Sequence, residues 1–356
     1  MTIDEVLDRV LHGEPLQHVD LTHLDLRGAD LSGAVYEGVR FPRTMAGARL
    51  KEATFTECDF GGCELRGADA HLATFFGCRF LGATLDESQL VAANFTNCDA
   101  SGASFGRAHA PIANWVRCCL DRASFVGANL DRANLVEVTL DGTSLEGANL
   151  DRGTYYKLDL STTKLDGANL TLTTFVESKL GARSFAGNKL FRTQFMRGSL
   201  AGSSFAQCDA TECNFTDCDI DGCDFSGATL DRALFGGAHG SRIKLTNAKL
   251  RNAIMEKVKL PGADLRGADL TEGYLFGAEL EGASFSGATL SYADLSHANL
   301  SAVDFTGAAM FRTNLHRARR TNARLPSGPW LDDDAERAGV EDWKPKHGGE
   351  TRPGRT

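Results

Sequence analysis

Ten cysteines are the residues of this chain best suited to chemistry, because thiolates bind metals and act as nucleophiles. Nine of them lie at numbers ending in 3 or 8: Cys58, Cys63, Cys78, Cys98, Cys118, Cys208, Cys213, Cys218 and Cys223. A zinc ion needs ligands that converge to about 2.3 Å from one point, whereas a column of side chains at a strand spacing of about 4.8 Å diverges. Neighbours in such a column could form a disulfide by distance, which a reducing compartment disfavours. We predict buried small side chains, no metal site and no cofactor.

The remaining reactive residues form no catalytic pattern. The nine histidines are scattered, and no G-x-S-x-G, P-loop or H-E-x-x-H motif occurs. We therefore predict no catalytic residues and no enzymatic activity. The formal charge of −9 argues against direct nucleic-acid binding. No apolar run approaches the roughly 18 residues of a membrane span, and the N-terminus lacks a secretory pattern. These features predict a cytoplasmic protein with no membrane partner.

The element that positions these residues is a five-residue repeat. From Leu50 to Leu325 every fifth residue is Leu or Phe at 45 of 56 positions. Two residues earlier lies a register of small residues, mostly Ala and Cys, as in the segment GADLRGADL at 262–270. An earlier set, from Leu16 to Phe41, follows the same rule one residue out of phase. We expect an irregular corner between Phe41 and Met45, beside Pro42.

The period of five predicts short strands joined by tight corners, because it fits neither the helical period nor a flat sheet. The small residue and the Leu or Phe lie two apart, hence on one face of a strand. Aromatic residues of this register fall almost entirely on numbers ending in 5. Large side chains thus alternate with Leu from side to side, which requires an even number of sides. We predict an all-β, right-handed, four-sided parallel β-helix, a solenoid with about 20 residues per coil.

The ends of the chain predict two further segments. Residues 1–15 read as a capping helix over 2–12, with Thr2 and Glu5 as a capping box and an apolar face from Ile3 to Leu11. Residues 16–325 form the β-helix. Residues 326–356 are a polar tail that we expect to be partly disordered, with Trp330 and Trp343 folding back over the last coil.

Four of the seven residues that depart from the small-residue register predict local distortion. They are Leu158, Arg183, Asn188 and Ile243. We expect bulges near 183–188 and 238–243. Because a buried guanidinium is costly, we expect the Arg183 side chain to reach solvent.

The repeat resembles that of the pentapeptide repeat family over about 310 of the 356 residues. The resemblance implies a right-handed quadrilateral β-helix and a role in binding other macromolecules. The phrase GEPLQHVDLTHLDLRGADLSGA at 13–34 is also similar to pentapeptide repeat proteins found with bacterial contractile secretion systems, which implies an accessory role there. Because the repeat motif is the scaffold itself, it does not define a partner.

One outward column predicts a binding surface. Residues one coil apart stack on one side, and one such column is apolar over five coils: Val116, Val136, Tyr156, Val176 and Met196. We call it the apolar stripe. The next column, the charge column, alternates in sign: Arg117, Glu137, Lys157, Glu177 and Arg197. Strand propensity and weak surface ion pairs could explain both. Contiguous apolar patches more often mark a contact with a partner protein or a second copy of the chain.

A second hypothesis rests on acidic residues. Some pentapeptide repeat proteins resemble B-form DNA and bind DNA gyrase or topoisomerase IV. The densest acidic run here, which we call the acidic collar, comprises Asp209, Glu212, Asp217, Asp219, Asp221 and Asp224. These residues surround one coil and form no groove-like stripe, so a protein-interaction scaffold is our first hypothesis and a DNA mimic that inhibits or protects a topoisomerase is the alternative.

Overall fold

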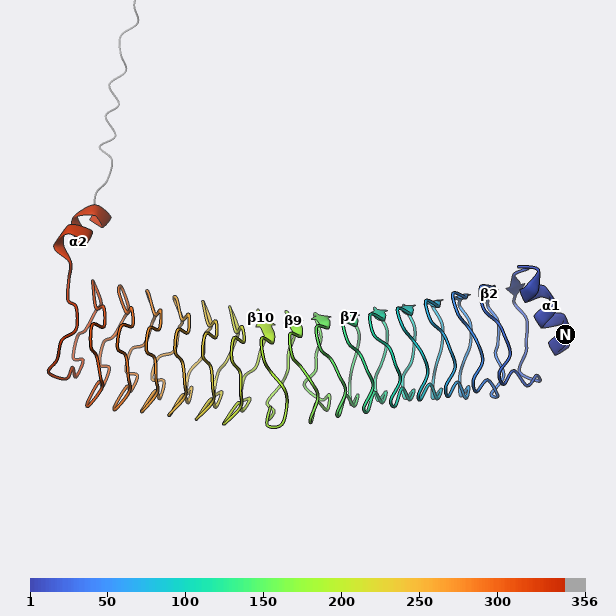
Figure 1. The fold of residues 1–356 in the computed structure, drawn as a ribbon, viewed down its shortest axis with the longest axis horizontal. Helices are drawn as coiled ribbons and strands as arrows, with labels where there is room; N and C mark the ends of the chain where they lie inside the picture. Colours follow the sequence, from blue (N-terminus) through green and yellow to red (C-terminus); the bar gives the residue numbers. More distant parts are fainter. Residues whose placement is uncertain (343–356) are drawn as a thin grey trace, which may run out of the picture.

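Stacked coils build an elongated, gently curved rod (Figure 1). The computed structural model describes residues 1–342. Helix α1 (Ile3–Leu11) lies at one end and helix α2 (Ala335–Asp342) at the other. Among the described residues, no helix is long and apolar enough to cross a membrane.

Each coil is held to the next by four ladders, one per side. One side carries ten short strands in a parallel sheet whose spatial order follows the chain. The other three sides are joined by isolated bridges between residues one coil apart, such as Asp59 with Arg79, Glu64 with Thr84 and Asp69 with Gln89. The strands are β1 (Leu16–Gln17), β2 (Val35–Glu37), β3 (Thr54–Thr56), β4 (Thr74–Phe76), β5 (Asn94–Thr96), β6 (Asn114–Val116), β7 (Asn134–Val136), β8 (Thr154–Tyr156), β9 (Thr174–Val176) and β10 (Gln194–Met196). The predicted right-handed, four-sided β-helix is confirmed.

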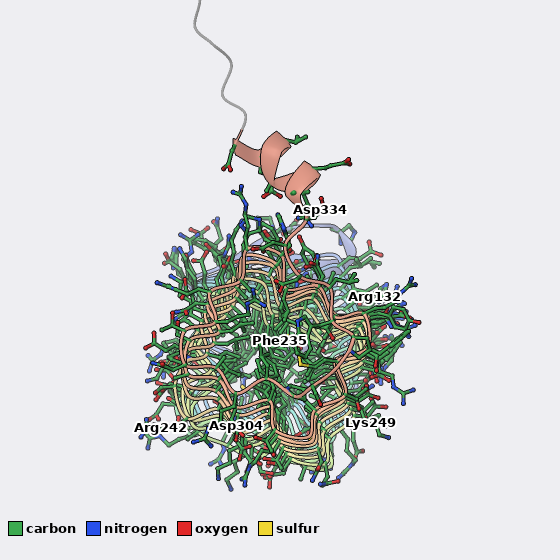
Figure 2. All side chains as sticks on the ribbon, turned by 90° about the vertical axis from the view of Figure 1, so that its left-hand side faces the viewer. Arg132, Phe235, Arg242, Lys249, Asp304 and Asp334 are labelled. Atoms are coloured by element: carbon green, nitrogen blue, oxygen red, sulfur yellow. The ribbon has the colours of Figure 1, made fainter. Side chains whose placement is uncertain are left out.

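Side chains fill the tube, as the end-on view shows around Phe235 (Figure 2). Aromatic rings stack along a wall: the Phe75 ring centroid lies 4.9 Å from that of Phe55 and 4.7 Å from that of Phe95. Rings from opposite walls meet edge to face, with Phe195 and Phe205 centroids 6.0 Å apart at 76°. Both arrangements suit the charge distribution of aromatic rings.

The predicted irregular corner is present where the chain drops one residue. Asp20 pairs with Arg40, 20 positions on, but Arg40 pairs with Asp59, only 19 on. The Cys63 thiol donates to the Pro42 carbonyl at this corner (3.1 Å). One residue is therefore missing from the coil beside Pro42, as the phase shift predicts.

Helix α1 closes the first coil. Thr2 and Glu5 form the predicted capping box, and Val6 is fully buried. Leu11, which we placed on the apolar face, is instead 81% exposed. The last turn of the helix therefore projects beyond the coil that it covers.

Ladders break at three of the register violations. Among the described residues, no bridge joins Thr139 to Asp159, Lys164 to Ser184 or Lys189 to Asp209. The crowding side chains beside these gaps are the adjacent pair Val138 and Leu158, then Arg183, then Asn188. At Ile243 the bridges from Asp224 to Lys244 and from Lys244 to Asp264 are intact. The bulge predicted at 183–188 is present. Near 238–243 the ladder beside Ile243 is regular, but the corner at 241–242 is a bend in which the Ile243 amide does not donate to the Gly240 carbonyl.

The Arg183 side chain is partly exposed, but it folds back onto the backbone and does not extend into solvent as we expected. Its guanidinium donates to the backbone carbonyls of Leu180 (2.7 Å), Thr163 (2.9 Å) and Leu160. The Asn188 amide likewise donates to the Ala168 carbonyl (3.0 Å). The Thr163, Leu180 and Ala168 carbonyls accept these side chains, and no backbone amide of the described residues donates to them.

The C-terminal segment returns to the solenoid. Leu331 bridges Asn314, and Trp330 packs against the core in partial burial. Helix α2 follows at 335–342 within the tail that we expected to be partly disordered. Trp343 lies outside the described residues.

Candidate functional site

The apolar stripe is in register on five adjacent strands. Val116 pairs with Val136, Val136 with Tyr156, Tyr156 with Val176, and Val176 with Met196. Each side chain is half-buried against its neighbours. The strand face that carries the stripe lies along the inner side of the rod's curve (Figure 1). These side chains leave an apolar track of roughly 20 Å at strand spacing.

The charge column occupies the corner next to the stripe. Arg197 pairs with Glu177 (3.3 Å), and the Lys157 ammonium lies 4.9 Å from the centre of the Tyr156 ring. Arg117 and Glu137 form no salt bridge within the described chain. All five charged residues of the column are exposed and available to a partner.

The opposite flank of the stripe is polar and uncharged. The Asn134 amide donates to Asn114 (2.7 Å), and the Asn114 amide donates to Asn94 (2.8 Å). Thr154 and Thr174 continue the column. The strand face thus has a polar neutral edge, an apolar centre and a charged edge.

A hollow of about 710 Å³ adjoins the charge column at the ladder gap between Thr139 and Asp159. Its lining includes Glu137, Lys157, Asp121, Asp141 and Asp159. The Thr162 hydroxyl bounds it, accepting from the Gly142 amide (3.1 Å) and donating to Asp141 (2.9 Å). The hollow extends the contact surface sideways from the stripe.

Half of the acidic collar is paired with bases from adjacent coils. Glu212 contacts Arg192 and Arg232 (2.7 Å to the latter), and its pKa is lowered by the hydrogen bond from Arg192. Asp221 accepts from Ser241 and then from Arg242, which lowers the Asp221 pKa to about 2. Asp224 lies 3.8 Å from Lys244. The continuous negative surface expected of a DNA mimic is therefore interrupted at three of the six positions.

The cysteines occupy the inward register, as predicted. Nine are buried and Cys119 is partly exposed. The Cys98 thiol donates to the Phe75 carbonyl (3.4 Å), just as the Thr143 hydroxyl donates to the Leu120 carbonyl (2.7 Å). Burial raises the pKa of Cys63 to about 12. These thiols take the place of small core side chains along the walls of the tube.

We expect one of the ten thiols to react in the native protein. Cys119 is the partly exposed one, and its sulfur lies 3.0 Å from the Ser101 hydroxyl and 3.2 Å from the Thr139 hydroxyl. Thiol titration with Ellman's reagent checks this, giving one equivalent in buffer and ten in denaturant. Several fast equivalents in buffer would contradict the inward placement of the other nine.

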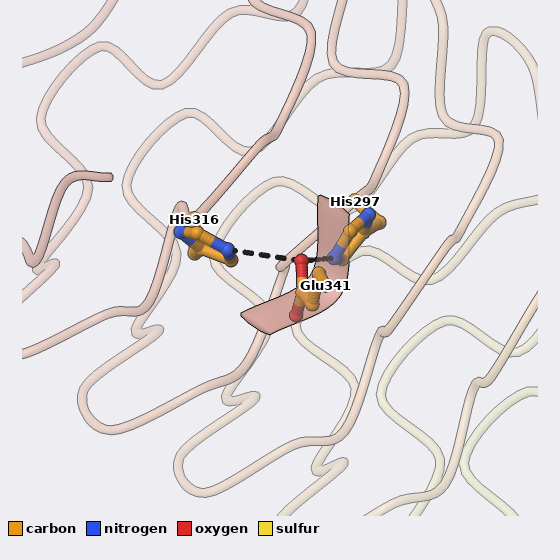
Figure 3. A group of neighbouring side chains, drawn as sticks. All are labelled: His297, His316 and Glu341. Carbon is orange, nitrogen blue, oxygen red and sulfur yellow. Dashed lines mark hydrogen bonds and ion pairs between the residues drawn. The ribbon is translucent and has the colours of Figure 1, made fainter. Parts of the chain in front are cut away.

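Two histidines and a glutamate meet beneath α2 (Figure 3), an arrangement that the sequence did not predict. The Nε2 atoms of His297 and His316 lie 3.2 Å and 3.3 Å from the same Glu341 carboxylate oxygen. The His316 Nδ1 accepts the backbone N–H of Asp334 (3.0 Å). In the neutral ring, Nε2 must then carry the proton and donate to Glu341.

That tautomer argues against a metal at this cluster. A metal on the His316 Nε2 would require the proton on Nδ1, where it would face the Asp334 N–H. Arg317 and Arg337 also contact Glu341 (3.5 and 2.9 Å). The cluster is a polar contact that fastens α2 to the last coils.

Two protein-family models match the sequence of this solenoid. One described as "Pentapeptide repeat region" matches residues 188–265, and one described as "Pentapeptide repeats (8 copies)" matches 45–80, 118–153 and 278–317. Together they cover more than half of the chain. The chain belongs to the pentapeptide repeat family. A search of curated proteins gives no match for this pentapeptide repeat protein.

Solved structures of pentapeptide repeat proteins are similar to it. Rfr23 from the cyanobacterium Cyanothece 51142 is 30% identical over 28% of this chain and 64% of its own length, with a TM-score of 0.24. HetL from Nostoc sp. strain PCC 7120, involved in heterocyst differentiation regulation, is 23% identical over 92% of this chain and 98% of its own, with a TM-score of 0.15. QnrB1, a plasmid-mediated fluoroquinolone resistance protein, is 18% identical over 60% of this chain and 92% of its own, with a TM-score of 0.31.

Proposed function

We propose that this pentapeptide repeat protein is a non-enzymatic scaffold that binds another protein through the apolar stripe and the charge column. The observation that carries the proposal is the in-register run from Val116 to Met196. A contiguous apolar track rimmed by charge is typical of a protein contact. A tube filled by its own side chains presents its chemistry only on its outer faces.

The finer role of the scaffold rests on the sequence. The phrase at 13–34 supports an accessory role beside a bacterial contractile secretion system. We place the scaffold in the cytoplasm, where its ten cysteines would stay reduced. A DNA mimic that acts on gyrase or topoisomerase IV has less support, because bases pair with Glu212, Asp221 and Asp224. Charge-based binding of that kind depends on a surface free of neutralising partners.

The salt dependence of binding tests this proposal against the alternative. The tagged protein captures its partner from an extract of the native host at about 50 mM salt, and the complex is washed at about 500 mM. Apolar contact keeps the partner bound, whereas contact held by exposed charges weakens as the Debye length shortens. Release in the wash, together with loss of capture by Glu212→Gln/Asp221→Asn/Asp224→Asn, would replace our proposal with the DNA mimic.

A further inference from the structure

The spacing of residues along the apolar stripe is close to the spacing between successive turns of an α-helix. Successive coils place one stripe residue about every 4.8 Å, and an α-helix places one residue of a given face about every 5.4 Å. Over the four intervals from Val116 to Met196 the two series drift apart by only about 2.4 Å. A helix along the rod axis can therefore contact every coil of the stripe with one apolar side chain per turn.

The same face already carries a helix of this chain. His316 belongs to the same outward column as the stripe, six coils beyond Met196. It is 1% exposed because Asp334 and Glu341 lie on it. Figure 1 shows α2 on the side of the rod that carries the strands. The stripe and this helix-covered position therefore lie in one column, six coils apart.

The charge column adds a constraint on the occupant. Its signs run plus, minus, plus, minus, plus from Arg117 to Arg197, one per coil and beside only one edge of the stripe. The other edge is the neutral column of Asn114, Asn134 and Thr154. A complementary helix carries acid, base, acid, base, acid on one flank, one per turn, and neutral polar residues on the other.

We propose that the apolar stripe binds an amphipathic α-helix of a partner protein with that alternating order of charges. The inference rests on the proposed function and names the chemistry of its partner. An apolar residue each turn packs between successive stripe residues. The flanking charges pair with the charge column and set the register of the helix, since a shift by one coil brings like charges together.

Two designed helical peptides of about 18 residues, or five helical turns, test the proposal by fluorescence anisotropy on the full chain. Both carry the same leucine face, with flank charges in the order Glu-Lys-Glu-Lys-Glu in one and Lys-Glu-Lys-Glu-Lys in the other. Both peptides carry their charges on the same flank, so that flank meets the charge column in the same helix orientation for both; a reversed helix would place it over the neutral column. The chain's net charge of −9 favours the second peptide, so any general attraction works against the expected result.

We expect the first peptide to bind at least about 30-fold more tightly, because five pairs each worth a few tenths of a kcal/mol change from attraction to repulsion between the peptides. Lys157→Glu/Glu177→Lys should reduce this ratio, and Val136→Glu/Val176→Glu should abolish binding of both. Val126→Glu/Phe311→Glu, which alters exposed apolar positions on other sides (44% and 47% exposed), should change neither affinity.

Three results would overturn the inference: equal affinities, no binding of either peptide, or a doubled mass of the free protein on sedimentation, which would make a second copy the occupant. The proposed function fails separately. If host-partner capture is lost in Val136→Glu/Val176→Glu while neither peptide binds, the scaffold proposal stands and the helix is wrong. If capture is unaffected by that substitution, the scaffold surface itself is wrong.

Discussion

Replacing Phe175 with alanine is expected to lower the free energy of unfolding by about 3–5 kcal/mol, through lost burial and the cavity left behind. The ring is 2% exposed, and its centroid lies 5.2 Å from that of Tyr155 and 5.5 Å from that of Phe195. Few neighbours can move into the gap, because the coils above and below are fixed by parallel strand pairing. Chemical denaturation followed by circular dichroism measures the change.

Val126→Ala is the matched control for Phe175→Ala. Val126 is 44% exposed on the opposite wall, so its truncation should alter stability by less than about 0.5 kcal/mol. If Phe175→Ala were as mild as this control, the inward orientation of the Leu/Phe register would be wrong.

The solenoid could be predicted from the sequence because each coil repeats the same pattern of small and large inward-facing residues. The register through Phe55, Phe75 and Phe95 buries one ring per coil, so periodicity alone identifies the inward face and the number of sides. The missing residue beside Pro42 appears as a phase shift in the same pattern. The Thr2–Glu5 capping box is a local signal that does not depend on tertiary context.

The ladder breaks could be predicted only in part, because crowding depends on the neighbours that stack one coil above and one coil below. Ile243 stacks between Cys223 and Ala263, which are small, and its ladder closes. Leu158 stacks on Val138, which is also large, and the ladder between them opens. A rule that considers one position at a time predicts crowding at Leu158 and at Ile243 alike. The sizes of the residues stacked one coil away determine whether the ladder opens.

The contact between α2 and the last coils could not be predicted from the sequence. The segment 331–342 has no apolar periodicity, and Glu341 meets His316 across 25 residues of chain. One local signal was present: Asp334 caps the helix by accepting from the amides of Glu336 and Arg337 (3.0 Å each). The stripe, by contrast, could be predicted from the coil length, because residues 20 positions apart stack on one side. That its side chains are half-buried is visible only in the structure.

Val136→Glu/Val176→Glu is expected to weaken partner binding by at least about 100-fold, because each substitution places a carboxylate in an apolar contact. Both side chains point outward from β7 and β9 and are half-buried, so the solenoid should still form. Surface plasmon resonance against the partner isolated by capture gives the affinity, and circular dichroism confirms the fold.

The most direct test of the account compares capture from one host extract by wild type, Val136→Glu/Val176→Glu and Val126→Glu/Phe311→Glu. The account predicts that one partner is captured by wild type and by the Val126/Phe311 variant, and that it is absent with the Val136/Val176 variant. Capture of the same partner by all three proteins would contradict the assignment of the apolar stripe as the contact surface.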